Sequence, residues 1–336
     1  MPPDKLKNIL VTGGAGYVGA VLVPKLLREG FQVTVLDSMF FTDMGLSSAK
    51  SNPNLKIIVG DIRDISCVKK ALAGSDAVIH LASISNDPSG DLNQKLTVEV
   101  NLDATVNLAK IAKEVGVKRF INVSTSSVYG VKDEPNVTED LSLEPLTIYS
   151  KTKAEAESRV MELMDDNFTV TTIRPATVCG YSLKMRLDLS VNILTMHAIT
   201  KGAITVFGGK QKRPNIHIDD ICDYYVEFLN LPKDKINGQT YNAGYENFTI
   251  LEIAEVVRDI IDPKVKIVVT ETNDSRSYHI SSDKIKRELG LKPKKTIKDA
   301  VLDIKRASDE GMVDWGDINF YNVKKMKQLI EDGKVA

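Results

Sequence analysis

Residues 8–30, NILVTGGAGYVGAVLVPKLLREG, place an apolar stretch, a glycine-rich turn and an amphipathic stretch in immediate succession. The pattern predicts a buried strand over 8–14, followed by a helix over 16–30 that Gly30 ends. A strand that runs through such a turn into a helix is typical of the first unit of a doubly wound α/β fold. This stretch therefore predicts the fold class, and the following segments can be compared with it.

The glycines of this turn, Gly13, Gly16 and Gly19, have a GxxGxxG spacing. Such glycines permit a tight turn and let the backbone approach a pyrophosphate at a helix N-terminus, although they can also serve close packing alone. Asp37 ends the next predicted strand, where a carboxylate accepts hydrogen bonds from ribose hydroxyls and repels a 2′-phosphate. Residues 38–40 contain no Arg or Lys, so NAD is favoured over NADP.

The following segments keep alternating between apolar strands and amphipathic helices. Continuous apolar strands separated by helices indicate a parallel sheet covered on both faces, a Rossmann-type α/β fold. The strands are expected at 32–37, 55–61, 76–82, 119–130 and 170–176, and the helices at 67–74, about 96–115 and about 149–165.

Beyond residue 180 the alternation loosens. We expect an NAD-binding domain over 1–180 and a smaller, mainly substrate-binding α/β lobe over 181–336, with part of 205–245 returning to the Rossmann core. No role can be assigned to the tail, 310–336. The later elements are expected as helices over 185–202, 249–261 and 281–290 and a strand over 265–272.

Composition excludes several classes of protein. The 336 residues include 44 Lys plus Arg against 45 Asp plus Glu, so no net field attracts nucleic acid or a membrane surface. Three scattered cysteines without a CxxC pair and four scattered histidines argue against disulfides and a metal site. The start, MPPDKLKNILV, has no leader-like pattern and no apolar run reaches membrane-spanning length, which predicts a cytoplasmic protein.

The segment YSKTK places Tyr149 and Lys153 four residues apart, on one face of a helix. A phenol with a pKa of about 10 is a weak base at neutral pH, and lowering that pKa by about three units takes roughly 4 kcal/mol, which nearby cations can supply. The same spacing is common on solvated helices. Here it follows a dinucleotide motif and the hydroxyl-rich STSSVYG (124–130), so a catalytic pair is favoured.

Several motifs in order make the chain resemble the extended short-chain dehydrogenase/reductase family, in particular its UDP-glucose 4-epimerase-like group of nucleotide-sugar epimerases and dehydratases. The resemblance runs from Asn8 to Ile304. The motifs are TGGAGYVG (12–19), Asp37, GDIRD (60–64), HLAS (80–83), STSSVYG (124–130), YSKTK (149–153), IRPATVCG (173–180), RPNIHIDD (213–220) and SRSYHISSDKI (275–285).

The resemblance implies roles for individual residues. Thr125 would bind the substrate hydroxyl that is oxidised, Tyr149 would be the general base, and Lys153 would orient the nicotinamide ribose and lower the tyrosine pKa. Asp61 would reach the adenine or, on a plainer interpretation, cap a helix. The implied cofactor-binding residues are Gly13, Gly16, Tyr17, Val18, Gly19, Asp37, Asp61, Ile62, Leu81, Ala82, Asn101, Tyr149 and Lys153.

The two residues after Thr125 bear on the reaction. In dehydratases of the family the equivalent threonine is followed by Asp and Glu, which serve as acid and base in the elimination of water, whereas this chain has Ser126 and Ser127. A serine hydroxyl has a pKa too far from neutrality for either task. The sequence therefore keeps the residues for oxidation and lacks those for dehydration.

The resemblance also implies a grip on a nucleotide sugar. Arg213 and Arg276 would bind the substrate phosphates, since the guanidinium fork matches phosphate oxygens. The segment MRLDL (185–189) is unusual for the family, and His80 is expected to be a core histidine. The implied substrate-binding residues are Ser85, Asn86, Thr125, Ser126, Arg186, Asn192, Arg213 and Arg276.

These features together predict an NAD-dependent epimerase that acts on a nucleotide-linked sugar through a transient ketone, with C4 as the favoured position. A nucleotide-sugar 4-dehydrogenase or 4-keto reductase is the alternative, ahead of a 4,6-dehydratase and a non-catalytic NAD-binding regulator. The resemblance implies a homodimer formed through the helices near 96–115 and 149–165.

Overall fold

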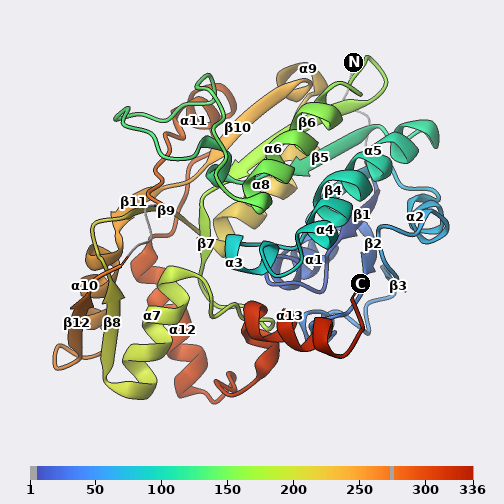
Figure 1. Ribbon diagram of the computed structural model, residues 1–336. Coiled ribbons are helices and arrows are strands. Elements are labelled where there is room, and N and C mark those ends of the chain that lie inside the picture. Colours follow the sequence, from blue (N-terminus) through green and yellow to red (C-terminus); the bar gives the residue numbers. More distant parts are fainter. Residues whose placement is uncertain (1–5, 273–275, 336) are drawn as a thin grey trace.

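The computed structural model describes residues 6–272 and 276–335; residues 1–5, 273–275 and 336 lie outside the described part. Its centre is a seven-stranded sheet of order β10-β6-β5-β4-β1-β2-β3, and every neighbouring pair is parallel (Figure 1). This confirms the predicted fold class. The strands are β1 (Asn8–Thr12), β2 (Gln32–Asp37), β3 (Leu55–Val59), β4 (Ala77–His80), β5 (Arg119–Val123), β6 (Thr169–Pro175) and β10 (Gln239–Ala243).

The two faces of this sheet carry separate apolar cores. Alternate strand residues point to opposite faces, so Ile9 and Val11 join one core and Leu10, between them, joins the other. The helices α1 (Gly19–Arg28) and α8 (Ile218–Asn230) cover the first face. The second face is covered by α2 (Ile65–Leu72), α5 (Thr105–Glu114) and α6 (Ile148–Met161).

The second lobe consists of two small sheets and a group of helices. One sheet has the order β11-β9-β7 and the other pairs β12 with β8, while α7, α10 and α12 contact one another beside them (Figure 1). Its elements are β7 (Thr177–Cys179), α7 (Ser190–Lys201), β8 (Ala203–Phe207), β9 (Lys212–His217), β11 (Glu246–Thr249), α10 (Ile250–Ile261), β12 (Lys266–Thr270) and α12 (Ile297–Asp309). Two further helices, α9 (Lys233–Ile236) and α11 (Asp283–Leu289), contact β10 of the large sheet instead.

Several predicted boundaries were wrong. The strand expected over 119–130 ends at Val123, and 126–129 form a 3₁₀ turn. The helix expected over 96–115 is α4 (Gln94–Val98), a π-helical turn at 99–104, and α5. The helix expected over 185–202 begins only at Ser190.

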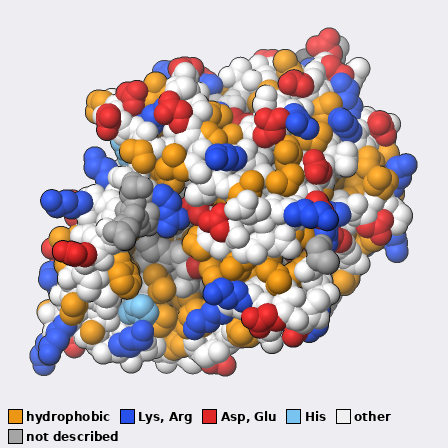
Figure 2. All heavy atoms as spheres, viewed as in Figure 1, with side chains coloured by type: hydrophobic (Ala, Val, Ile, Leu, Met, Phe, Trp, Pro, Cys, Tyr) orange, Lys and Arg blue, Asp and Glu red, His pale blue; other side chains and the backbone are white. Residues whose placement is uncertain are grey.

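The remaining short elements lie along the cavity described below or next to it. They are α3 (Asp87–Gly90), 3₁₀ turns at 44–46 and 318–320, and α13 (Asn322–Glu331), which brings the C-terminal tail against α3 (Figure 1). Lys and Arg side chains are interspersed with Asp and Glu side chains on the face drawn in Figure 2. None of the described helices is both long and apolar enough to cross a bilayer.

Candidate active site

A cavity of about 570 Å³ opens at the carboxyl ends of the parallel strands, and residues from both lobes line it. Ligands of open parallel sheets bind at this edge, and the volume suits a small-molecule site. The glycine-rich turn forms one wall, the segment 123–127 and α6 form the floor, and second-lobe residues close the far side.

The glycine-rich turn has no space for side chains at two of its predicted positions. A Cβ on Gly13, whose φ is +71°, would lie 2.7 Å from the backbone nitrogen of Ala82. A Cβ on Gly19 would lie 2.4 Å from the carbonyl oxygen of Gly14. The backbone thus lines the cavity directly at the start of α1, as a bound pyrophosphate requires.

Asp37 lies at the end of β2 on the cavity wall. Its carboxylate accepts hydrogen bonds from the backbone nitrogens of Ala15 (3.0 Å) and Met39 (2.9 Å), which fix its orientation. Burial raises the pKa of this carboxyl group, and the two backbone hydrogen bonds oppose that shift. A carboxylate held in this way fits the ribose hydroxyls of an NAD molecule.

The other predicted cofactor residues divide into cavity residues and supporting ones. Asp61 lines the cavity, and its carboxylate binds the Arg63 guanidinium at 2.8 and 3.0 Å. The residue that caps the N-terminus of α2 is Asp64, so the interpretation of Asp61 as a helix cap was wrong. Asn101 lies in the π-helical turn, fully buried, and its amide holds both backbone groups of Ile84. The predicted residues that line the cavity are Gly13, Gly16, Tyr17, Val18, Gly19, Asp37, Asp61, Ile62, Leu81, Ala82, Tyr149 and Lys153.

Thr125, Tyr149 and Lys153 come together at the floor of the cavity. The Thr125 hydroxyl accepts a hydrogen bond from the backbone nitrogen of Ser127 (3.2 Å), which begins the 3₁₀ turn. Tyr149 lies in the first turn of α6, and Lys153, one turn later, donates from Nζ to the carbonyl oxygen of Val123 (2.5 Å). Geometry therefore places all three predicted catalytic residues in one site.

Burial dominates the acid–base behaviour of this site. It raises the pKa of Tyr149 to about 12, although a hydrogen bond with Thr125 and the charge of Arg186 act to lower it. Burial also lowers the pKa of Lys153 to about 8. Arg186 is a cation that acts to lower the Tyr149 pKa in this structure. The same role for Lys153, together with the charge of the oxidised nicotinamide, stays a prediction.

The loop over 83–90 is tied to both lobes. Asp87 accepts hydrogen bonds from the Thr147 hydroxyl (2.5 Å) and from the Arg276 guanidinium (2.8 Å). Thr147 is the N-cap of α6, so the loop is joined to the helix that carries Tyr149. Gly90 lies so close to Tyr149 that a Cβ there would be 3.3 Å from the tyrosine Cβ.

A buried ion pair lines the cavity that also contains Tyr149. Arg186 binds Asp188 in a bidentate pair, with Nη2–Oδ2 and Nε–Oδ1 distances of 2.6 and 3.2 Å. The Asn86 amide donates to the same carboxylate, and Asn86 itself has a φ of +78°. Asn86 thus adopts a backbone conformation that is rare outside glycine while its side chain contacts the buried ion pair.

The predicted phosphate-binding residues differ in where they lie. Arg213 and Arg276 line the cavity, and Arg213 donates to the carbonyl oxygen of Arg276 (2.7 Å). Asn192 lies behind the cavity wall with its amide engaged by Gly180 and Tyr17 (each 3.1 Å), so its phosphate contact stays a prediction. The other predicted substrate residues that line the cavity are Ser85, Asn86, Thr125, Ser126 and Arg186; Ser275, in the last motif, lies outside the described residues.

Sequence reasoning missed part of the wall. Lys184 and the tail residues Asn322, Met326 and Val335 line the same cavity, and no local pattern marks them because they are brought together only by the fold. Ser124 was quoted but given no role; its buried hydroxyl lies on the wall and has no hydrogen-bond partner among the described residues.

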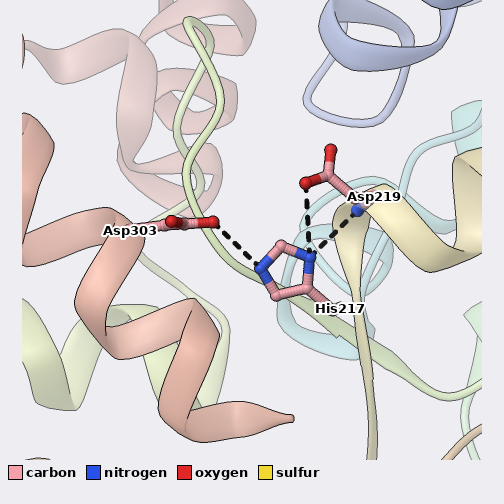
Figure 3. A group of neighbouring side chains, drawn as sticks. All are labelled: His217, Asp219 and Asp303. Carbon is pink, nitrogen blue, oxygen red and sulfur yellow. Dashed lines mark hydrogen bonds and ion pairs between the residues drawn. The ribbon is translucent and has the colours of Figure 1, made fainter. Parts of the chain in front are cut away.

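Two histidines of the structure have structural partners. His80 is fully buried between the hydroxyls of Thr12 (2.7 Å) and Thr105 (2.9 Å), and burial lowers its pKa to about 3, as expected for a neutral core histidine. His217 lies between the carboxylates of Asp219 and Asp303 (Figure 3).

The side chains of His217, Asp219 and Asp303 lie close enough together to hold a metal ion. Several of their atoms already have partners, but His217 Nε2 has no hydrogen-bond partner among the described residues. The His217 Nδ1 atom accepts a hydrogen bond from the Asp219 backbone nitrogen (3.1 Å), and Nε2 faces Asp303 at 3.3 Å (Figure 3). Lys295 Nζ binds both carboxylates, at 2.6 and 3.3 Å. An ammonium thus supplies the positive charge, and the group joins α8 to α12.

Comparison with known proteins agrees with this geometry. Residues 9–244 match the model of the NAD dependent epimerase/dehydratase family. UDP-glucose 4-epimerase of Lactobacillus helveticus is 29% identical over 318 residues, which cover 88% of this chain and 94% of that protein. UDP-glucuronic acid decarboxylase 1 of Arabidopsis thaliana is 31% identical over 311 residues, covering 88% and 68%.

A solved structure shares the whole architecture. The UDP-glucuronic acid 4-epimerase of Bacillus cereus, in complex with UDP-glucuronic acid and NAD, superposes with a TM-score of 0.80 and 27% identity over 89% of this chain and 99% of that one. The chain therefore belongs to the NAD-dependent epimerase/dehydratase family, and its cofactor is NAD. The family comprises nucleotide-sugar epimerases, dehydratases and decarboxylases.

Proposed function

We propose that this enzyme epimerises a nucleotide-linked sugar at C4 through a transient ketone. The observation that carries the proposal is the floor of the cavity, where Thr125, Tyr149 and Lys153 lie together without an acidic neighbour in the turn 126–129. Oxidation of a hydroxyl needs a hydrogen-bonding hydroxyl, a base and a cation, and all three are present. Elimination of water needs an additional acid and base, and Ser126 and Ser127 are neither.

Each residue has a task that follows from its position. Tyr149 would accept the proton of the sugar hydroxyl, and Thr125 would donate a hydrogen bond to the oxygen as its charge develops. Bound NAD would supply the hydride acceptor. Because burial holds the Tyr149 pKa near 12, the base works only when the closed site contains enough positive charge, to which Arg186 contributes. Turning of the ketone within the cavity would expose its other face before reduction.

The pair of Arg186 and Asp188 suggests the class of sugar. The side chains are only 14% and 13% exposed, and the charge of the guanidinium is already matched by the carboxylate. A sugar carboxylate beside this pair would meet Asp188 as well as Arg186, and like charges repel. We therefore propose a neutral hexose as substrate, with Asp188 accepting hydrogen bonds from its hydroxyls.

Three further features remain proposals. Arg213 and Arg276 would bind the nucleotide diphosphate, since both line the cavity on the side of the second lobe. The enzyme would act in the cytoplasm as a homodimer formed through α5 and α6. The boundary near residue 180 would divide an NAD-binding domain from a substrate-binding lobe. Two later elements would belong to the first domain, since α8 packs on the large sheet and β10 pairs with β6 within it.

The test is incubation of the purified protein with a panel of nucleotide sugars without an added electron acceptor. The anomeric protons would be followed by NMR and the absorbance recorded at 340 nm. An equilibrating pair of C4 epimers with little lasting absorbance supports the proposal. A stoichiometric rise at 340 nm that stops after one turnover contradicts it and identifies a 4-dehydrogenase. Formation of a 4-keto-6-deoxy sugar or of a pentose would identify a dehydratase or a decarboxylase.

A further inference from the structure

The C-terminal tail returns to the NAD half of the cavity. After α12 ends at Asp309, the chain runs to α13, where Asn322, Val323 and Met326 line the same cavity as the glycine-rich turn. Val335, near the end of the chain, lines it too. The tail is therefore part of the wall of the site, although none of the family motifs extends into it.

Helix α13 is held there by apolar packing. Met326 and Leu329 are buried against Leu96, and Phe40 and Phe41 pack against the same cluster. These two phenylalanines follow Asp37, the residue placed to bind the ribose, within four positions. The helix thus covers the segment of chain that leaves the ribose-binding strand.

Lys184 connects this helix to the second lobe. The side chain is buried, Nζ donates a hydrogen bond to the Asn322 side-chain oxygen (2.8 Å), and it lies 4.7 Å from the centroid of the Phe41 ring. Among the described residues it forms no ion pair. The charged groups that act on it from a distance are Arg186, Asp188, Asp317 and Asp37.

A buried ammonium without a matching anion is costly, and an amide oxygen and an aromatic face compensate only part of that cost. Burial lowers the pKa of Lys184 to about 7, which reflects the same cost. A methionine side chain at position 184 would fill the same space without the cost of burying a charge. Lys184 lines the same cavity as the glycine-rich turn, and the two phosphates of a bound dinucleotide would bring two negative charges into that cavity.

We propose that Lys184 and helix α13 form a clamp that retains the dinucleotide, with the Lys184 ammonium bound to its phosphates and Asn322 holding that side chain in place. The clamp suits an enzyme whose cofactor returns to its starting state in each cycle and so need not leave. The inference rests on the use of NAD and not on the proposed reaction, and it stands if the enzyme proves to be a dehydratase.

The experiment measures NAD binding directly. Lys184→Gln, Asn322→Ala and a chain ending at Asp317 would be compared with wild type for NAD retained after gel filtration and for NAD affinity of the stripped protein by calorimetry. We expect Lys184→Gln to weaken NAD and ADP binding about tenfold or more, because a charge-assisted hydrogen bond is lost, and to leave adenosine binding unchanged. The shortened chain should release NAD faster. Lys327→Gln, an exposed position on α13, is the matched control and should bind as wild type does.

Three results would overturn the clamp. One is wild-type NAD affinity and retention in Lys184→Gln. Another is an equal loss of adenosine and ADP binding, which would mean that the substitution damages the pocket rather than removing a phosphate contact. The third is a wild-type preference for NADP over NAD that Lys184→Gln abolishes, which would assign Lys184 to a 2′-phosphate. If the shortened chain does not fold, the two point variants decide the matter alone.

Discussion

Replacing Asp188 by asparagine should change which sugars the enzyme accepts. The substitution keeps the size and shape of the side chain and removes its charge. Arg186, which now forms two hydrogen bonds with Asp188 at 2.6 and 3.2 Å, would be left as a buried cation in the wall of the cavity. Asn86, which donates to the same carboxylate, could still bind the amide oxygen that the substitution introduces.

The magnitude follows from the burial of the pair. The side chains are 14% and 13% exposed, so solvent screens the guanidinium little. A hydrogen bond to a charged group contributes about 1.5–3 kcal/mol, and this is what a sugar carboxylate could gain from the unpaired Arg186. Asp188→Asn should therefore shift the ratio of kcat/KM for a nucleotide-linked uronic acid over the neutral sugar upward by roughly 10- to 150-fold.

The assay is a competition between UDP-glucose and UDP-glucuronic acid, with both epimer products quantified by NMR. Wild type should prefer the neutral sugar, and the variant should lose or reverse that preference. Asp317→Asn is the control, because this carboxylate lies outside the cavity wall. A wild-type preference for the uronic acid, or an unchanged ratio in the variant, would refute the role given to the ion pair.

Three other perturbations test separate parts of the structure. Gly13→Ala should abolish NAD binding in calorimetry while Gly30→Ala does not, because both glycines have positive φ but only at Gly13 would the added Cβ meet backbone atoms; equal NAD affinities would contradict this account. Arg174 of β6 and Glu157 of α6 form a buried ion pair beneath the site. Arg174→Met should lower the free energy of unfolding in urea by about 3–5 kcal/mol, because the buried Glu157 carboxylate loses its partner, and a loss below about 1 kcal/mol would show the pair to be dispensable. NAD affinity should fall as pH rises above the Lys184 pKa of about 7, since only the ammonium binds phosphate, and should be pH-independent in Lys184→Gln. The same low pKa means that the unfolded chain binds the extra proton, so this lysine makes the fold more stable as pH rises from about 7 toward its unfolded value of 10.5.

The sequence was sufficient where local chemistry decides the structure. Gly13 and Gly19 occupy positions at which a side chain would strike the backbone, so their spacing already described the turn. Tyr149 and Lys153 share a helix face by helical geometry alone. The apolar strands required helices on both faces of a parallel sheet, and the two separate cores follow from that.

The sequence predictions failed where local hydrogen bonds or contacts between distant residues determine the structure. The strand expected to continue to residue 130 ends at Val123, because the Thr125 hydroxyl caps a turn instead of continuing the ladder. The contact between Lys184 and Asn322 joins residues 138 positions apart, and the tail contains no sequence motif from which this contact could be predicted. Asn192 was assigned to phosphate by its position in the family pattern. Its amide is hydrogen-bonded to the backbone behind the wall, and the phosphate contact stays a prediction.

The measurement that tests the central claim most directly uses a nucleotide hexose deuterated at C4. If the hydride removed from C4 returns to the same carbon, the epimer formed by the enzyme in ordinary water retains the deuterium, as mass spectrometry and NMR would show. The account predicts full retention in the product, no lasting absorbance at 340 nm, and a primary isotope effect if hydride transfer limits the rate. An epimer that carries hydrogen from solvent at C4, or a ketone that accumulates with reduced cofactor, would contradict it.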